Sequence, residues 1–523
     1  MAWYVPVEPA PLMKILDCTF RDGGYYTNWD FDAALVDAYL DAMAILPVDA
    51  VELGYRSRPQ SEYLGKFFYC PAYVLEKARA KLKGKKLAIM LNEKDCDAST
   101  IHTLIAPHAG SIDIVRFAVD PERIGSLPPM IDALHALGIE VAVNLMYLSQ
   151  YVANPSGLVA AARVVESADC LNLVDSYGGV YPDQVRDLVR AVKSESPLVL
   201  GYHGHNNLEL AFANALAALE AGCTWLDSTL TGMGRGAGNL KTELVLTHYS
   251  AKMSGEVDMD VLSGVVDEFA KLHEQHQWGT NLPYMVSGAA SLPQKDVMDW
   301  VTKRSYSVNS MVRALENQRS GQRDNLKLPT FQAQSSATGP VLIIGGGPGA
   351  IDHAEGICKW IETNGVATVI HSSGKNAAAY AKVKAAQYFC LVGNEGKRIE
   401  RVFGNAGLPD AGFILPPYPR KMGTYLTPWM QERSCELSHI GFSQLYADSH
   451  TAVAMQAAID SGAQEIWIAG YDGYSGTFGI KEQDLFMENE HLFRSAANLG
   501  IRLFTLTPSK YSILIPVSPY ASI

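Results

Sequence analysis

The sequence predicts an α/β protein made of a closed (β/α)8 barrel followed by an open, mainly parallel sheet. The first observation is a repeat of eight units between Met13 and about His248, each a short apolar strand and then an amphipathic helix. Eight such units are typical of a TIM barrel, and the lack of an obvious break in strand order disfavours the alternative, an open doubly wound sheet. The second observation is a new βαβ series that begins with VLIIGGGPGA (341–350) and is too short for a barrel, which indicates a Rossmann-like domain.

The predicted barrel strands are short apolar runs. The segments between them carry apolar residues at three- and four-residue spacing, as in FDAALVDAYLDAMAIL (31–46), which indicates amphipathic helices. We expect the eight strands at residues 13–20, 50–57, 86–92, 112–120, 140–149, 170–178, 198–206 and 224–234.

The predicted domains follow from these repeats. The barrel takes residues 1–254, and the helical patterns over 255–328 are expected to pack on it. Residues 329–340, PTFQAQSSATGP, are polar and small with proline at each end, which indicates a linker. The Rossmann-like domain takes residues 341–523.

The composition narrows the class of protein. The 523 residues carry a formal net charge of −12 and no Lys/Arg-rich run, which argues against nucleic acid as the main partner. No apolar stretch reaches membrane-spanning length and the first residues lack a signal-peptide pattern, so we expect a cytoplasmic protein without membrane contact. The eight cysteines are scattered without a CxxC pair, so we expect free thiols in a reducing compartment.

Polar residues gather at the predicted carboxyl ends of the strands, where barrel enzymes place their sites. The stretch HGHNN (203–207) ends strand seven, and His203 and His205 lie two apart, so both side chains can face the barrel mouth. Asp22 follows strand one, which is two strands from strand seven in a closed barrel, and would complete a site of two imidazoles and one carboxylate. Asn239 could add an amide oxygen. The alternative is a pair of hydrogen-bonded histidines without a metal.

Three separated motifs point to a family. They are LDCTFRDGG (16–24), GYHGHNN (201–207) and GMGRGAGN (232–239). Together, and in this order, they resemble the DRE-TIM metallolyases (the HMGL-like superfamily), most closely the 4-hydroxy-2-oxovalerate aldolase-like branch. The resemblance extends over about residues 13–310.

The resemblance implies a lyase with a metal site. Asp22, His203 and His205 would be the metal ligands, with Asn239 as a candidate fourth, and Arg21 would hold the enolate oxygen. Mn²⁺ is the cofactor that the resemblance favours. Imidazole and carboxylate ligands would also accept Mg²⁺, Co²⁺ or Zn²⁺. The family also implies a homodimer.

The implied reaction is the cleavage of a 4-hydroxy-2-oxo acid to pyruvate and an aldehyde, or its reverse, through an enolate. A divalent cation takes up the developing negative charge, and Arg21 adds a donor at the same oxygen. A base must remove the proton of the 4-hydroxyl group. Where the family has a histidine four residues after the motif arginine, this chain has Tyr25. A phenol has an ordinary pKa near 10, so Tyr25 is either an unusual base or an aromatic wall.

Four further barrel residues are candidates. Glu52 and Asp175, at the ends of strands two and six, could act as acid–base groups or as positioning carboxylates. Asp17 and Thr19 are expected behind the site, where Asp17 would orient Arg21 or a ligand histidine. Two rival functions stay open. One is a Claisen-type synthase that joins an acyl-CoA to a 2-oxo acid on the same metal site. The other is a barrel without catalysis that serves as a binding or scaffold module.

The second domain carries a glycine-rich turn between a strand and a helix. In GGGPGA, Gly345, Gly347 and Gly349 could bring backbone N–H groups and a helix N-terminus to a phosphate. The next strand ends in VIHSS (369–373) without the carboxylate of dinucleotide sites, so an NAD ligand is not favoured.

With GYDGYSG (470–476) and MENEH (487–491), this half faintly resembles Rossmann-like domains of the pterin-diphosphokinase-like and sialyltransferase-like families. The resemblance implies a nucleotide or phosphosugar ligand. Asp472 is either a ligand of that site or the cap of a loop. The other interpretation is a domain without catalysis, used for dimerisation or for holding a partner.

Overall fold

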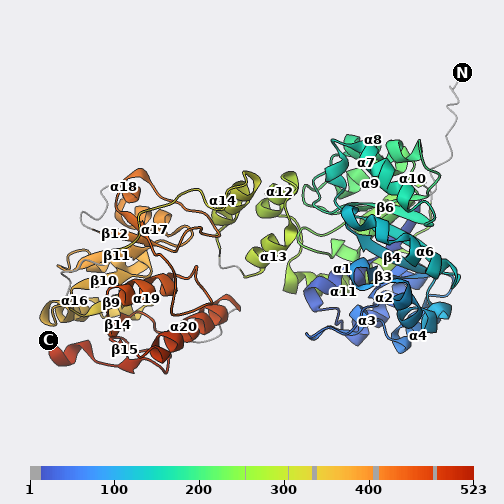
Figure 1. The fold of residues 1–523 in the computed structure, drawn as a ribbon. Helices are drawn as coiled ribbons and strands as arrows, with labels where there is room; N and C mark the ends of the chain where they lie inside the picture. Colours follow the sequence, from blue (N-terminus) through green and yellow to red (C-terminus); the bar gives the residue numbers. More distant parts are fainter. Residues whose placement is uncertain (1–12, 254, 304–305, 333–338, 405–410, 475–479) are drawn as a thin grey trace, which may run out of the picture. The chain divides into compact units, whose positions relative to one another are not determined.

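The chain divides into two compact units, Met1–Met298 and Asp299–Ile523 (Figure 1). The computed structural model describes residues 13–253, 255–303, 306–332, 339–404, 411–474 and 480–523. The division lies inside the helical segment 255–328 that was expected to pack on the barrel. Helices α11 (Met259–His276) and α12 (Leu282–Ala289) belong to the first unit, whereas α14 (Val308–Arg319) belongs to the second.

The expected linker, residues 329–340, begins as part of the second unit. The backbone N–H of Phe331 donates to the carbonyl oxygen of Glu436 at 2.7 Å, and Thr330 forms a β-bridge with the same residue. The middle of the expected linker, residues 333–338, lies outside the described residues.

The first unit is a closed barrel of eight strands, as predicted. Each strand pairs in parallel with the next along the chain, and β8 pairs with β1, with Lys14 beside Trp225. The strands are β1 (Lys14–Asp17), β2 (Ala50–Tyr55), β3 (Lys86–Asn92), β4 (Ile114–Val119), β5 (Glu140–Leu145), β6 (Cys170–Asp175), β7 (Leu200–Gly204) and β8 (Trp225–Ser228).

Helices surround the barrel and bury the outward faces of its strands (Figure 1). The helix predicted from residues 31–46 begins after Asp32, whose carboxylate accepts the N–H groups of Ala34 and Leu35 at 2.8 and 3.3 Å. Besides α11 and α12, the helices that begin in this unit are α1 (Thr19–Thr27), α2 (Ala33–Ile45), α3 (Lys66–Tyr69), α4 (Ala72–Lys81), α5 (Ala98–Leu104), α6 (Pro128–His135), α7 (Pro155–Val164), α8 (Pro182–Lys193), α9 (Ala211–Ala221), α10 (Thr242–Met253) and α13 (Gln294–Lys303).

The first strand is shorter than predicted, because the motif after it is helical. β1 ends at Asp17, and the motif residues Arg21 and Asp22 lie in α1. The two glycines that follow allow close packing of this helix. A Cβ on Gly24 would lie 2.1 Å from the Trp29 ring, so this position has no room for a side chain.

Inside the barrel, the inward side chains form two layers. Small and apolar residues fill the layer nearer the amino ends of the strands; they include Leu16, Ala50, Ala88, Ile114, Ala142 and Cys170. Two residues further along, where side chains again face inward, the strands carry polar residues. These are Glu52, Arg116, Asn144, Asn172, His203 and Asp227, all buried. Gly201 leaves room for this layer, because a Cβ there would lie 1.8 Å from Asn172 Oδ1.

The second unit is built on an open sheet of eight parallel strands, in the order β13-β12-β11-β10-β9-β14-β15-β16. The sequence prediction of a second parallel sheet with helices is confirmed. The strands are β9 (Val341–Ile344), β10 (Thr368–His371), β11 (Ala386–Cys390), β12 (Gly412–Leu415), β13 (Ser434–Glu436), β14 (Glu465–Ala469), β15 (Arg502–Thr505) and β16 (Ile515–Pro516).

Helices cover both faces of this sheet. On β9, Val341 and Ile343 belong to a core shared with α19 and α20, whereas Leu342 and Ile344 belong to a core shared with α16. This alternation follows the two-residue period of a strand. Besides α14, the helices of this unit are α15 (Gly349–Asp352), α16 (Ala354–Thr363), α17 (Glu395–Phe403), α18 (Pro428–Gln431), α19 (His450–Asp460) and α20 (Ile480–Asn498).

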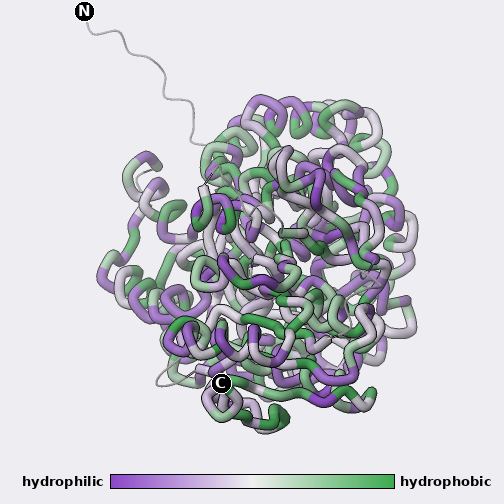
Figure 2. The backbone as a smooth tube through the Cα atoms, turned by 90° about the vertical axis from the view of Figure 1, so that its left-hand side faces the viewer, coloured by the Kyte–Doolittle hydropathy of each residue, from purple (hydrophilic) through white to green (hydrophobic). Residues whose placement is uncertain are grey.

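Hydrophobic and hydrophilic residues alternate over short distances along the whole backbone tube (Figure 2). Within the described ranges, every helix is too short or too polar to span a bilayer. All eight cysteines are free thiols, as the scattered spacing predicts.

Candidate metal and substrate site

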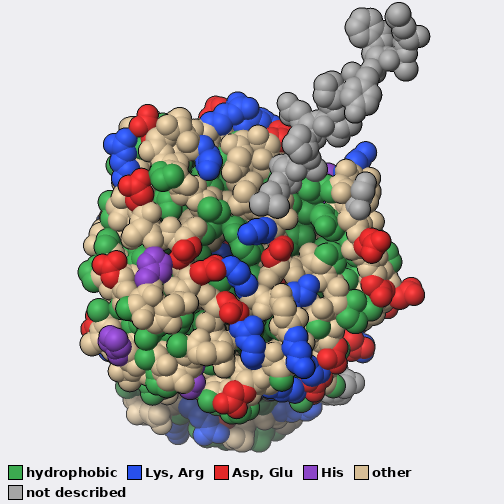
Figure 3. All heavy atoms as spheres, turned by 90° about the vertical axis from the view of Figure 1, so that its right-hand side faces the viewer, with side chains coloured by type: hydrophobic (Ala, Val, Ile, Leu, Met, Phe, Trp, Pro, Cys, Tyr) green, Lys and Arg blue, Asp and Glu red, His purple; other side chains and the backbone are tan. Residues whose placement is uncertain are grey.

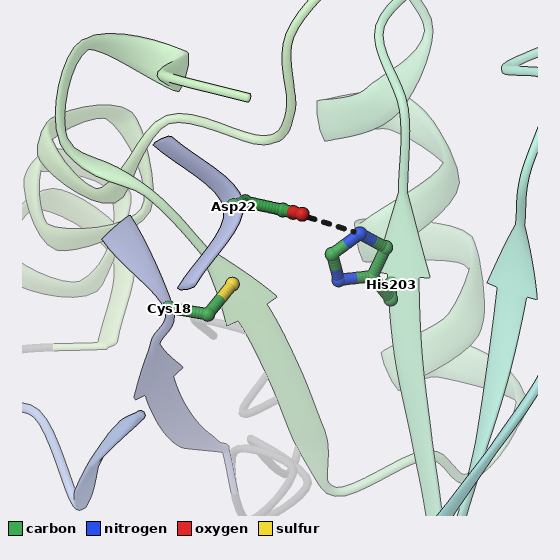
Figure 4. Close-up of side chains that lie close together, drawn as sticks. All are labelled: Cys18, Asp22 and His203. Carbon is green, nitrogen blue, oxygen red and sulfur yellow. Dashed lines mark ion pairs between the residues drawn. The ribbon is translucent and has the colours of Figure 1, made fainter. Parts of the chain in front are cut away.

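The structure brings Asp22, His203, His205 and Asn239 together at the carboxyl ends of the barrel strands. Asp22 Oδ2 lies 3.5 Å from His203 Nε2, and the two side chains point toward one another in Figure 4. The ring centroids of His203 and His205 are 5.1 Å apart. Asn239 Nδ2 donates to Asp22 Oδ2 at 2.5 Å.

Local backbone geometry holds the last two residues in place. His203 is on β7, whereas His205 follows the strand and forms an antiparallel bridge with Asn239 from the loop after β8. In that loop Gly238 has φ of +77°, and a Cβ there would lie 2.3 Å from the carbonyl oxygen of Gly232. Only glycine fits this position, which accounts for the glycine beside Asn239 in the motif.

Both histidines are oriented by acceptors behind them. His203 Nδ1 is 2.9 Å from Asp227 Oδ2, and His205 Nδ1 is 2.8 Å from the backbone oxygen of Asp175. This arrangement, common behind metal-binding histidines, leaves Nε2 of each ring for a metal. Burial, together with nearby His203, lowers the pKa of His205 to about 4, so its imidazole is neutral at physiological pH, as a ligand must be.

The remaining donors also fit a divalent cation. Burial alone would raise the pKa of Asp22, but Arg21, His203 and His205 hold it below its ordinary value, so the carboxylate is ionised. Asn239 Oδ1 is buried and has no hydrogen-bond partner among the described residues. A buried amide oxygen without a partner is costly unless a ligand satisfies it.

Cys18 also lies near this site. Its Sγ and the ligand atoms of Asp22 and His203 lie within 4.8 Å of one another, and Figure 4 shows the three side chains. Burial raises the pKa of the Cys18 thiol well above its ordinary value, and the thiol donates to the carbonyl oxygen of Ser228 at 3.5 Å. A protonated thiol is a poor ligand, so His205 is the better third donor.

A chain of buried charges links Arg21 to His203. Arg21 forms an ion pair with Asp22, and its Nε donates to Glu52 Oε2 at 2.8 Å. Glu52 Oε2 also accepts from Arg116, at 3.1 Å. Arg116 in turn forms an ion pair with Asp227. Asp227 is the carboxylate behind His203, which is the last member of this series of charges.

The sequence placed Arg116 at the functional rim of the barrel without a role, and it did not single out Asp227. Burial would raise the pKa of Asp227, but Arg116 and His203 hold it at about 2, so it stays charged behind the histidine. The signal was a charged residue at an inward position of an apolar strand, two residues after Ile114 on β4 and after Trp225 on β8.

Asp17 and Thr19 lie behind the site, but their hydrogen bonds connect neighbouring elements and do not orient the side chains of the site. Asp17 accepts hydrogen bonds from the hydroxyls of Thr19, Tyr39 and Thr242, each at 2.6 Å, and not from Arg21 or a histidine among the described residues. Thr19 Oγ1 in turn accepts the backbone N–H of Leu230 at 2.8 Å. These bonds tie the end of β1 to α2, to α10 and to the loop after β8.

Glu52 and Asp175, the two other predicted carboxylates, lie outside the cavity lining. Glu52 is fully buried between two arginines. Asp175 accepts the N–H groups of Gly179 and Val180 at 3.2 and 3.1 Å, and burial raises its pKa to about 6 despite these bonds. Asp175 therefore shapes the loop after β6.

A cavity of about 300 Å³ opens onto Asp22, His203 and His205. Tyr25 lines it, and its hydroxyl lies 3.2 Å from that of Tyr55. The Arg235 guanidinium lies over the Tyr25 ring, 4.7 Å from the centroid. Other lining residues are Arg21, Met90, Ala118, Asn144, Met146, Tyr147, Val174, Ser176, Tyr177, Gln294 and Lys295.

In the second unit, the glycine-rich turn carries a carboxylate. The backbone N–H of Gly349 donates to Asp472 Oδ2 at 2.8 Å, and a Cβ on Gly347 or Gly349 would lie 2.3 Å from the same carboxylate. Asp472 therefore caps this turn, at the N–H group that a phosphate would use. Phosphate binding by Gly345, Gly347 and Gly349 stays a prediction, as does the likeness to the two families named for this half. Residues 475 and 476 of the GYDGYSG motif lie outside the described residues.

Comparison with known proteins decides the family of the barrel. The HMGL-like family profile matches residues 12–267. A 4-hydroxy-2-oxovalerate aldolase from Carboxydothermus hydrogenoformans is 32% identical over 264 residues, which cover 48% of this chain and 74% of that protein. The chain belongs to the HMGL-like family. The prediction of a DRE-TIM enzyme of this family is confirmed.

One further sequence relative and one solved structure are similar to this HMGL-like barrel. An oxaloacetate decarboxylase from Mycobacterium tuberculosis is 26% identical over 320 residues, covering 59% of this chain and 92% of that protein. The crystal structure of the N-terminal domain of a proposed aldolase from Bacteroides vulgatus superposes with a TM-score of 0.55. It is 46% identical and covers 58% of this chain and 100% of that domain.

Proposed function

We propose that the first unit is a divalent-cation-dependent aldolase that cleaves 4-hydroxy-2-oxo acids to pyruvate and an aldehyde, or runs in reverse. The observation that carries the proposal is the convergence of Asp22, His203 and His205 beside Arg21 in one cavity. The name of the Carboxydothermus relative supports the same reaction.

The site has donors for one cation. Asp22 and Nε2 of His203 and His205 would hold it, with Asn239 Oδ1 as a further ligand. When bound, a divalent cation draws negative charge from the 2-oxo oxygen as the carbon–carbon bond breaks. Carboxylate and imidazole ligands suit Mn²⁺, which we propose, and also accept other first-row cations.

Arg21 stabilises the enolate. Its guanidinium faces the cavity, and Glu52 fixes its direction through the 2.8 Å bond from Nε. Because the guanidinium is already held by buried carboxylates, it needs no rearrangement when charge develops on the enolate oxygen. Glu52 therefore acts as a positioning carboxylate.

Tyr25 is the group that we assign to the 4-hydroxyl of the substrate. Apart from the metal-site residues, the cavity lining offers no carboxylate or imidazole among the described residues. Tyr25 stands where the family has its histidine, and its hydroxyl oxygen lies 3.2 Å from that of Tyr55. In cleavage, Tyr25 in its phenolate form accepts the hydroxyl proton as the bond between C3 and C4 breaks, and becomes a neutral phenol.

Deuterium exchange into the methyl group of pyruvate, followed by NMR, tests the proposal. Exchange reports enolate formation and needs no aldehyde. We expect exchange with Mn²⁺, its loss with a chelator, and its loss in Arg21→Ala and His203→Ala. His135→Ala, which changes an exposed histidine paired with Asp169, is the matched control and should exchange like the wild type. Folded protein that binds Mn²⁺ but never exchanges the methyl protons would contradict the proposal.

Tyr25 also favours a second candidate, oxaloacetate decarboxylation. Loss of CO₂ from oxaloacetate leaves the same pyruvate enolate, but no hydroxyl proton has to be removed, so a base at position 25 is unnecessary. The decarboxylase relative from Mycobacterium tuberculosis supports this candidate. Tyr25→Phe separates the two reactions, since it should abolish aldol cleavage and spare decarboxylation.

A further inference from the structure

Two cationic side chains of the cavity lack acidic partners. Arg235 and Lys295 both line it, and neither forms an ion pair with a carboxylate among the described residues. On the face drawn in Figure 3, Lys/Arg and Asp/Glu side chains are intermingled. Two unpaired cations in one cavity are notable in a chain with a net charge of −12.

Arg235 has a buried donor that a ligand could use. Its guanidinium lies 4.7 Å from the centroid of the Tyr25 ring, and its Nε is buried without a hydrogen-bond partner. A buried N–H without a partner is destabilising, and a bound acceptor would remove that cost. Arg21, the other arginine of the cavity, differs because its Nε and Nη1 are already bonded to Glu52 and Asp22.

The position of Arg235 tells which part of the substrate it meets. The 2-oxo acid end belongs to Arg21 and the metal-site residues. Arg235 lies instead over Tyr25, the residue that we assign to the 4-hydroxyl. It therefore faces the half of the substrate that leaves as the aldehyde.

We propose that the aldehyde half of the substrate carries a second anionic group, a carboxylate or a phosphate monoester, which Arg235 binds with help from Lys295. This inference rests on the proposed aldolase function. A guanidinium binds both anions through paired N–H donors, and an ammonium adds a point charge. A hydrogen bond to a charged group contributes about 1.5 to 3 kcal/mol, which is roughly 10- to 100-fold in affinity.

Matched pairs of aldehydes, condensed with pyruvate and Mn²⁺, test the inference. The carboxylate pair is succinic semialdehyde against butanal, and the phosphate pair is D-glyceraldehyde 3-phosphate against D-glyceraldehyde. For at least one pair we expect kcat/KM to be roughly 10- to 100-fold higher for the charged member. Which pair shows the preference identifies the anion.

Variants of Arg235 and Lys295 test whether these residues cause the preference for the charged aldehyde. Arg235→Gln should bring the charged-to-neutral ratio close to one, and Lys295→Gln should lower it partly. The ratio is taken within each variant, so a general loss of activity cancels. Lys83→Gln removes an exposed charge outside the cavity and should leave the ratio unchanged.

Pyruvate methyl exchange, measured on the same proteins, separates the two ideas. Exchange in the wild type without preference for any charged aldehyde overturns this inference and leaves the aldolase proposal standing. Absence of exchange in the wild type overturns both. A fall in exchange in Arg235→Gln as large as the fall with the charged aldehyde would place Arg235 on the carboxylate of pyruvate, which also overturns the inference.

Discussion

Replacing Asp227 by asparagine tests whether the buried charge chain fixes the metal site. Asp227 keeps its pKa at about 2 against an ordinary value of 3.8, and each pKa unit corresponds to 1.36 kcal/mol. The ionised carboxylate therefore contributes about 2 to 3 kcal/mol to folding. Because the folded-state pKa is lowered, this contribution is present above pH 4 and is lost as the pH falls from about 4 to about 2.

Two measurements follow from this magnitude. In metal-free protein at neutral pH, the melting temperature of the barrel in calorimetry should drop by roughly 4 to 12 °C in Asp227→Asn, since about 1 kcal/mol shifts Tm by about 2 to 4 °C in a domain of this size. The variant amide can no longer hold Nδ1 of His203 as a charged acceptor does. Mn²⁺ affinity should therefore fall by about 10- to 100-fold, measured by titration calorimetry.

The control is Asp49→Asn, an exposed carboxylate at the opposite end of the barrel that accepts the backbone N–H of Ile15 at 2.8 Å. It should bind Mn²⁺ like the wild type. An Asp227→Asn protein that binds Mn²⁺ within twofold of the wild type and melts at the same temperature would refute the reasoning.

Three further outcomes are expected. Tyr25→His should shift the alkaline rise of kcat/KM for aldol cleavage to lower pH, since imidazole titrates near 6.5 and phenol near 10; an unchanged pH profile would remove Tyr25 from proton transfer. Gly201→Ala should lower the free energy of unfolding by about 1 to 3 kcal/mol, because the new Cβ would lie 1.8 Å from Asn172 Oδ1, whereas Gly110→Ala meets no atom within 4 Å and should be neutral in the same denaturation assay. Burial raises the pKa of Asp175 to about 6, so its stabilising contribution is present below pH 4 and lost as the pH rises through 6; lowering the pH from 7 to 5 should raise Tm more in the wild type than in Asp175→Asn.

The barrel strands could be predicted because the spacing of apolar residues along the chain reflects the local secondary structure. The segment 86–92 is the strand Lys86–Asn92 at both ends, and β2, β5 and β6 begin at the predicted residue. The carboxyl ends were overestimated because contacts distant in sequence decide them. At the end of β1, Asp17 is bonded by Tyr39 and Thr242, and the chain then turns into α1.

The division of the helical segment could not be predicted from its pattern. An amphipathic helix shows that one face is buried, but not which sheet buries it. The segments containing α11 and α14 have similar patterns, yet the first belongs to the barrel unit and the second does not. The polar composition of residues 329–340 predicted a domain boundary there, whereas the two compact units divide between Met298 and Asp299.

The convergence of the candidate metal ligands could be predicted because their signal is local. His203 and His205 share a face by spacing alone, and Asp22 follows a strand that the closed barrel brings near them. The charge chain has no local signal. Arg116 and Asp227 are 111 residues apart, and only the barrel register makes them neighbours.

The two ends of the proposed substrate would contact parts of the site that differ in how many buried ion pairs hold their side chains. Arg21 and His203, which we assign to the enolate, are fixed by buried ion pairs and hydrogen bonds that continue through the barrel interior. Tyr25 and Arg235, which we assign to the aldehyde half, contact each other and, among the described residues, no buried carboxylate. A substitution on the aldehyde side therefore changes what is bound there without disturbing the groups that make the enolate. We therefore expect substitutions of Tyr25 and Arg235 to change the second substrate of the proposed reaction and to leave pyruvate methyl exchange unchanged.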